Sequence, residues 1–184
     1  HGENFAALIR AICLDDRTKG AYLSWLQELR PEEVEDVGTL RGAEGDTLFM
    51  LRENGKEFSA RALSEGTLRF AAITAAFFQP DMPGIMTIEE IESGIHPSRL
   101  RLLVELLRNR TGHGETQVFA TTHSPTTLAW LREADYRTTF VCKRDDETGE
   151  STIRPLTEVP HFKEVAEKCP PSELFAEGWL EAAL

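Results

Sequence analysis

The chain has 184 residues, 41% of them hydrophobic and 28% charged, which is typical of one globular domain. Its net charge of −11, from 31 acidic and 20 basic residues, argues against nucleic-acid binding through the overall field, because phosphate groups need a cationic surface. No apolar run approaches the ~18–20 residues of a membrane helix and no signal-peptide pattern opens the sequence, so we expect a cytoplasmic protein without a membrane partner.

Two helices are predicted in the first thirty residues, before Pro31. Apolar side chains recur there at helical spacing in two stripes: Phe5, Leu8, Ile9 and Ile12, then Tyr22, Trp25, Leu26 and Leu29. Residues 34–60 have the texture of short strands broken by glycines. Asn54–Gly55 predicts a hairpin turn between Leu48–Arg52 and Lys56–Ala60, because both turn residues tolerate a positive φ.

The middle of the chain alternates between helix and strand. Ser64 is placed to cap a helix that runs to about Phe78. The short apolar runs Ile85–Ile88 and Val118–Thr121 are predicted to be fully buried strands, with a helix over Ser98–Arg110 between them. A strand, a crossover helix and a second strand form a parallel βαβ unit, so we expect an α/β core.

A closing hairpin and helices are predicted for the C-terminal part. Thr138–Lys143 and Ser151–Leu156 have strand character and are joined by a polar turn, Asp145–Glu150. The tail from His161 is predicted to be helical, with an interruption at Pro170–Pro171.

Carboxylates follow the first buried strand directly, as Glu89, Glu90 and Glu92. Open α/β sheets bind their ligands at the carboxyl ends of parallel strands. Adjacent carboxylates repel each other, and a divalent cation or a raised pKa relieves that repulsion. The cluster therefore indicates metal-assisted hydrolysis or phosphoryl transfer, with Mg²⁺ as a suitable cation because it prefers oxygen ligands.

Two histidines and a glycine complete the candidate set. His123 follows the second strand, so we expect it near Glu89 and Glu90, where an imidazole can bind a phosphate oxygen or orient water. For His96, in the turn before a helix, capping is as good an explanation as an active role. Gly66 stands in the first turn of the helix after Ser64, where unpaired amides favour an anion and a missing side chain allows close approach. An ordinary N-cap explains Ser64 equally well.

Taken in order, these segments resemble the ATP-binding-cassette ATPases, specifically the heads of the RecF/SMC-like predicted ATPases. The matching segments are Leu63–Arg69 for the signature motif, Ile85–Glu90 for the Walker B strand, Ser93–Pro97 for the D-loop and Thr121–Pro125 for the switch-histidine loop. The resemblance implies a partial P-loop NTPase fold with a parallel βαβ core. It implies one domain over 1–184, made of a helical and hairpin segment (1–62), the motif core (63–143) and the C-terminal hairpin and helices (144–184).

The resemblance also implies roles for individual residues. Glu89 would help hold Mg²⁺ through a water, Glu90 would activate the hydrolytic water, and His123 would sense the γ-phosphate of ATP. Three residues would contact a nucleotide held mainly by a second copy of the head, namely Ser64, Gly66 and Thr67. The implied assembly is a head-to-tail homodimer that hydrolyses ATP and works on DNA or with a partner nuclease, as in DNA repair or phage defence.

The sequence departs from the family pattern in three ways. Glu89 replaces the usual aspartate, and Ile91 stands where relatives often have proline. No G-x-x-x-x-G-K-[ST] loop is present, since the only Gly-Lys pair, Gly55-Lys56, is followed by Glu57. We therefore expect the chain to begin partway through such a head and to be inactive alone.

Two other classes of protein stay open at this point. A Toprim-like metal-dependent nuclease also places a glutamate and a later acidic pair after strands, and Asp145-Asp146 imitates that pair. A non-catalytic regulatory or dimerisation module would retain the carboxylates as remnants.

Overall fold

The computed structural model describes residues 4–112, 114 and 116–184. The chain forms two compact units, His1–Thr121 and Thr122–Leu184, and each is described by itself. The division into 1–62, 63–143 and 144–184 within one domain stays a prediction.

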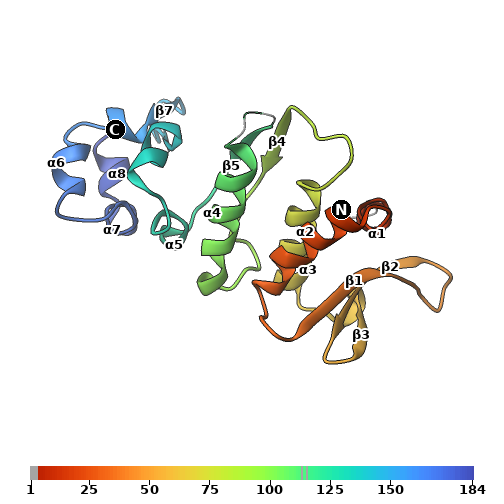
Figure 1. Ribbon diagram of the computed structural model, residues 1–184. Coiled ribbons are helices and arrows are strands. Elements are labelled where there is room, and N and C mark those ends of the chain that lie inside the picture. Colours follow the sequence, from red (N-terminus) through yellow and green to blue (C-terminus); the bar gives the residue numbers. More distant parts are fainter. Residues whose placement is uncertain (1–3, 113, 115) are drawn as a thin grey trace. The chain divides into compact units, whose positions relative to one another are not determined.

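The first unit opens with two helices and an antiparallel sheet (Figure 1). The elements are α1 (Phe5–Ile12), α2 (Asp16–Gln27), β1 (Val34–Arg41), β2 (Thr47–Glu53) and β3 (Lys56–Ser59). The strands pair in the order β1-β2-β3. Asn54 and Gly55 have φ of 49° and 73°, the positive values that a tight hairpin turn requires. The two predicted helices and the predicted hairpin are therefore confirmed.

A parallel βαβ unit completes the first unit. It follows α3 (Glu65–Ala76) and consists of β4 (Ile85–Ile88), α4 (Pro97–Thr111) and β5 (Gln117–Ala120), with β4 and β5 paired in parallel. The prediction of an α/β core with this crossover is confirmed. In the predicted loop after α4, His113 and Glu115 lie outside the described residues.

The prediction that these two strands are fully buried was wrong. Ile85 and Phe119 expose 61% and 54% of their surface, on the face opposite Met86 and Val118, which pack against the core. The reason is that this sheet has two strands and is covered on one face, whereas an apolar run alone suggests cover on both.

The core of the first unit joins its helices to both sheets. It includes Ile9 of α1, Phe49 of β2 and Phe70 of α3, each at most 1% exposed, in one cluster with Leu103 of α4. The hydroxyl of Tyr22 donates to the carbonyl of Ala71 at 3.0 Å, which ties α2 to α3. Helix α3 is thus packed against the two N-terminal helices, α1 and α2, within this core.

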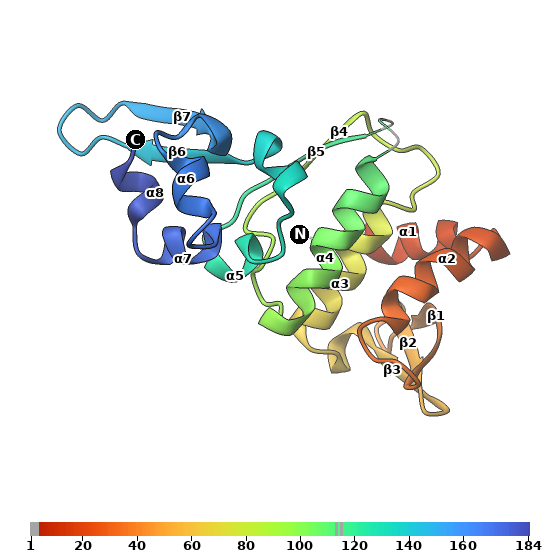
Figure 2. The ribbon, with the colours of Figure 1, turned by 60° about the vertical axis from the view of Figure 1, so that its left-hand side comes forward.

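The second unit is a hairpin covered by short helices. Its elements are α5 (Pro125–Leu128), β6 (Phe140–Arg144), β7 (Ser151–Pro155), α6 (Phe162–Ala166), α7 (Pro171–Ala176) and α8 (Trp179–Ala182). Figure 2 shows the helices α6–α8 gathered on one side of the antiparallel hairpin, where Val141, Phe162 and Leu180 share a core. The predicted hairpin and helical tail are confirmed. Within the described part of the chain, no helix is long and apolar enough to cross a bilayer.

Candidate functional site

The start of α3 is an N-capped helix end. Ser64 is its N-cap, and Ser64 Oγ accepts the Thr67 N–H at 3.2 Å. The two hydroxyls of Ser64 and Thr67 lie 2.8 Å apart in a hydrogen bond, and Thr67 is 2% exposed. The capping explanation of Ser64 is therefore confirmed, while nucleotide contacts by Ser64 and Thr67 stay predictions.

Gly66 lies against the turn after β4. A Cβ added at Gly66 would stand 2.2 Å from the carbonyl oxygen of Gly94, a separation that real Cβ atoms do not show. Gly94 itself has a φ of 70°, which suits a glycine. The missing side chain at position 66 therefore has a reason within the chain, in addition to the close ligand approach expected from the sequence.

Glu90 sits in a left-handed turn directly after β4. Its φ is 44°, an uncommon value for a residue with a side chain and one that costs about 1–3 kcal/mol. The end of β5 holds this turn, because Thr121 Oγ1 accepts the Glu90 N–H at 3.0 Å and the Thr121 carbonyl accepts the Ile91 N–H at 3.0 Å. Ile91 is also 3% exposed and belongs to the core. An apolar side chain thus anchors this turn in the core.

A second tie to the same turn comes from α3, and sequence reasoning missed it. Arg69 Nη2 donates to the carbonyl oxygens of Glu89 at 2.7 Å and Glu90 at 2.9 Å. Arg69 precedes Glu89 by 20 positions and Glu90 by 21, and both acceptors are backbone atoms. No spacing of side chains in the sequence therefore signals the contact. Arg69 ends the signature-like segment, and nothing in that pattern assigns it a role of its own.

The side chains of Glu89 and Glu90 are both exposed at the carboxyl end of β4. Their oxygens are ligands of the kind that Mg²⁺ accepts while it keeps several waters. Within the described ranges, no group of three His, Cys, Asp or Glu side chains is placed to hold a metal ion. Exposed carboxylates suit a cation that is held mainly by waters and substrate oxygens, and the role of Glu89 in holding Mg²⁺ through a water stays a prediction.

The histidines differ in what the structure says of them. His123 is exposed and belongs to the second unit, so its proximity to Glu89 and Glu90 stays a prediction. His96 caps α4, since its Nδ1 lies 2.8 Å from Ser98 Oγ and accepts the Ser98 N–H at 3.3 Å. Capping therefore accounts for His96.

Asp145, the first residue of the acidic pair in the nuclease alternative, shapes the turn between β6 and β7. One of its oxygens accepts the Thr148 N–H at 2.6 Å and the Glu147 N–H at 3.0 Å. The bond from the Thr148 amide, followed by those from the Thr148 hydroxyl and the Glu147 amide, lowers the pKa of Asp145. The pattern is that of a turn-forming aspartate.

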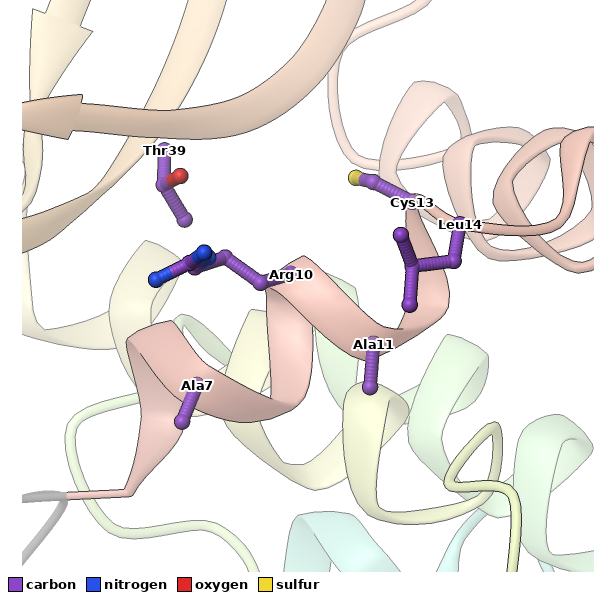
Figure 3. A pocket seen from close by; sticks show the side chains of 6 residues that line it. All are labelled: Ala7, Arg10, Ala11, Cys13, Leu14 and Thr39. Atoms are coloured by element: carbon purple, nitrogen blue, oxygen red, sulfur yellow. The ribbon is translucent and has the colours of Figure 1, made fainter.

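A shallow pocket lies elsewhere in the first unit, between α1 and β1 (Figure 3). It is lined by Ala7, Arg10, Ala11, Cys13, Leu14 and Thr39. Burial raises the pKa of the Cys13 thiol, which is the unreactive direction. None of the predicted site residues lines this pocket.

The fold and the strand-end carboxylates define the class of protein. A parallel βαβ core, with an N-capped helix tied to the turn that follows one of its strands, is part of a P-loop NTPase fold. Residues 14–129, more than half of the chain, match the family described as "AAA domain, putative AbiEii toxin, Type IV TA system". The chain belongs to this family of AAA-type ATPases.

Solved structures of SMC ATPases share the fold. One, from "Structural biochemistry of ATP-driven dimerization and DNA stimulated activation of SMC ATPases", has a TM-score of 0.57 and 16% identity, and the match covers 90% of this chain and 96% of that one. The Smc head domain of Pyrococcus yayanosii, with a coiled coil and joint, has a TM-score of 0.56 and 13% identity over 83% of this chain and 29% of that one.

A third structure is similar to the same extent. The Smc head domain of Pyrococcus furiosus, bound to the C-terminal domain of ScpA, has a TM-score of 0.56 and 13% identity over 83% of this chain and 39% of that one. The chain therefore spans less than half of the two Pyrococcus chains, and the likeness is one of fold. No curated protein sequence matches the chain significantly.

Proposed function

We propose that this chain supplies the signature-motif side of an ATP-hydrolysing head. The observation that carries the proposal is the left-handed turn at Glu90, which ties the end of β4 to both β5 and the start of α3. Strained backbone of this kind persists where the surrounding structure fixes it, and it is frequent at functional sites. The turn holds a carboxylate at the sheet edge where ligands of α/β proteins bind.

The proposed chemistry assigns one task to each side chain. Glu90 accepts a proton from the water that attacks the γ-phosphorus of ATP, as the bond from phosphorus to the leaving ADP oxygen breaks. Glu89 holds Mg²⁺ through a water, and the ion supplies positive charge to the phosphate oxygens when bound. His123 contacts the γ-phosphate and thereby reports its presence.

The start of α3 is proposed to face a nucleotide held mainly by a second copy of the head. Ser64 Oγ caps the Thr67 amide, but the amides before it have no partner within the helix, and the helix dipole favours an anion. Ser64 and Glu65 are exposed there, with Gly66 beside them. Among the proteins of similar fold, SMC ATPases are described as undergoing ATP-driven dimerisation. We propose the same kind of dimer here, formed head to tail by two copies of this chain.

The remaining contacts to the nucleotide would come from a P-loop, which this sequence lacks. The uncovered face of β4 and β5, with Ile85 and Phe119 exposed, supports a further layer that would bring that loop. Isolated, the chain is therefore expected to bind ATP weakly. DNA or a partner nuclease is the proposed downstream partner. Given the net charge of −11, contact with DNA would need a local basic surface.

The test is Glu90→Gln in the natural protein that contains this chain. Glutamine keeps the shape but accepts no proton, so we expect kcat to fall by roughly 100-fold or more, the upper part of the range for general-base catalysis, with little change in KM. Glu164→Gln, on an 81% exposed side chain of the second unit, is the matched control and should leave kcat unchanged. Equal turnover in the Glu90→Gln and wild-type proteins would show that the base has been misassigned.

A further inference from the structure

Arg69 connects the signature-like helix to the turn that carries Glu90. Its Nη2 donates to the carbonyls of Glu89 and Glu90 at 2.7 and 2.9 Å. A guanidinium stays charged at any pH of interest, and hydrogen bonds from a charged donor are shorter and stronger than neutral ones. One side chain thus fixes the two peptide groups that orient the two predicted site carboxylates.

The turn needs such ties because its backbone is strained. Glu90 has a φ of 44°, and the neighbouring Ser93 N–H also bonds to the Glu90 carbonyl at 2.8 Å. Thr121 holds the N–H side of the turn, and Arg69 holds its carbonyl side. Without Arg69, the peptide that follows Glu90 would keep only the bond from the Ile91 N–H to the Thr121 carbonyl and the bond from the Ser93 N–H to the Glu90 carbonyl. It would then rotate more easily toward a more common conformation, and the carboxylate would move with it.

The start of the same helix touches the same turn at a second point. Gly66 lies one helical turn before Arg69, and its α-carbon packs against the carbonyl of Gly94 closely enough to exclude a Cβ. Helix α3 and the segment from Glu89 to Gly94 are therefore joined at both ends of the contact. A displacement of the helix start has to move the turn, because packed elements of this kind do not deform independently.

We propose that Arg69 is a positioning residue for Glu90, and that it transmits the engagement of the α3 start to the carboxylate. This inference rests on the proposed function, in which the α3 start contacts a nucleotide held by the partner while Glu90 acts on the nucleotide of its own head. Arg69 then links two ATP sites through a single chain. The substrate itself is not contacted by Arg69.

The experiment replaces Arg69 with methionine, which keeps the apolar stem and removes every donor. Arg61→Met is the matched control, because Arg61 lies just before the same helix and, in the described part of the chain, pairs with the carboxylates of Glu44 and Asp46. Amide exchange of Glu90 and Ile91 is measured on the chain, and kcat and KM are measured on the natural protein that contains it. Arg69→Lys, with its donors on a different stem, is the conservative variant.

We expect Arg69→Met to remain folded while exchange at Glu90 and Ile91 accelerates at least about tenfold. Its kcat should fall by roughly 10–100-fold with KM within about twofold, since misplacing a catalytic group by 1 Å can cost about 100-fold. Arg69→Lys should lie between Arg69→Met and the wild type, and Arg61→Met should match the wild type. A merely stabilising arginine would instead lower the free energy of unfolding without this split between kcat and KM.

Two results overturn the inference. One is a wild-type kcat in Arg69→Met, and the other is unchanged exchange at Glu90 and Ile91 in a variant that has lost only overall stability. Failure of the proposed function looks different, because Glu90→Gln would then keep its turnover or the wild type would show none. Loss of turnover in Glu90→Gln together with normal turnover in Arg69→Met refutes the role of Arg69 alone.

Discussion

Replacing Gly66 with alanine tests the contact between α3 and the turn after β4. The added Cβ would stand 2.2 Å from the Gly94 carbonyl oxygen, whereas real Cβ contacts stay above 3.0 Å. The helix and the turn must therefore move apart until that distance reaches 3.0 Å. Both groups belong to the backbone, and the turn is fixed further by Arg69 and Thr121, so neither side yields cheaply.

The expected magnitude follows from two opposing effects. Overpacking that forces backbone shifts costs about 1–3 kcal/mol. Alanine also favours the helix over glycine by at most about 1 kcal/mol, and by less in the first turn. We expect Gly66→Ala to lower the free energy of unfolding of the first unit by about 1–2 kcal/mol.

A matched control lies in α2, where Gly20 is exposed and a Cβ would meet nothing within 4 Å. The same substitution there should raise stability by about 0.5–1 kcal/mol, so the two variants should differ in sign. Urea unfolding followed through amide exchange of the first-unit core is the suitable assay, because two units need not unfold together. A Gly66→Ala variant as stable as Gly20→Ala would refute the close packing of α3 on Gly94.

Two further predictions concern the same unit. Tyr22→Phe removes the buried hydroxyl that bonds to the Ala71 carbonyl and should cost about 0.5–1.5 kcal/mol in the same assay; no loss would mean that α2 is not tied to α3 in this way. Lys19→Met breaks the 2.7 Å ion pair between Lys19 and Asp36, whose side chains are 28% and 30% exposed. The loss should lower the free energy of unfolding by about 0.5–1 kcal/mol at pH 7. Burial acts to raise the pKa of Asp36, but the Lys19 hydrogen bond, the Val37 amide and nearby positive charges outweigh it and lower that pKa. The hydrogen bond to Asp36 raises the pKa of Lys19. The contribution of the pair is therefore present between the unfolded pKa values of about 3.9 and 10.4, and is lost as the pH falls through the lowered pKa of Asp36 or rises through the raised pKa of Lys19. The stabilities of the Lys19→Met and wild-type proteins should begin to converge as the pH falls below about 3.9, and the difference should vanish below the lowered pKa of Asp36. A constant difference down to about pH 2 would contradict this.

Much of the fold was predictable because its signals are local. The bounds of β4 follow from an apolar run ended by charge, and the β2–β3 hairpin follows from Asn54–Gly55. Burial was less predictable, since an apolar run does not show how many faces of its sheet are covered. Ile85 and Phe119 are exposed because, among the described residues of the first unit, the core covers only the opposite face of this sheet.

In the candidate site, too, the positions of residues were predictable from the sequence and their long-range contacts were not. Glu89, Glu90 and Ser64 stand at a strand end and a helix start, which sequence patterns reveal. The ties that orient them are contacts between distant residues, in which Arg69 and Thr121 bond to backbone groups of the turn. Such contacts depend on the register of β4 beside β5 and on the position of α3, and only the folded chain determines either.

Gly66 has two explanations, ligand approach and packing against Gly94, and an experiment has to separate them. The sequence suggests that its missing side chain admits a ligand, while the structure shows that it admits the carbonyl of Gly94. Both reasons predict lower ATP turnover in Gly66→Ala. Only the packing reason predicts a loss of stability without nucleotide, and only the ligand reason predicts a loss of affinity after stability has been matched. The Gly94 contact also joins α3 to the Glu90 turn. The measured loss of stability in Gly66→Ala therefore shows how much of a fall in ATP turnover is due to packing alone.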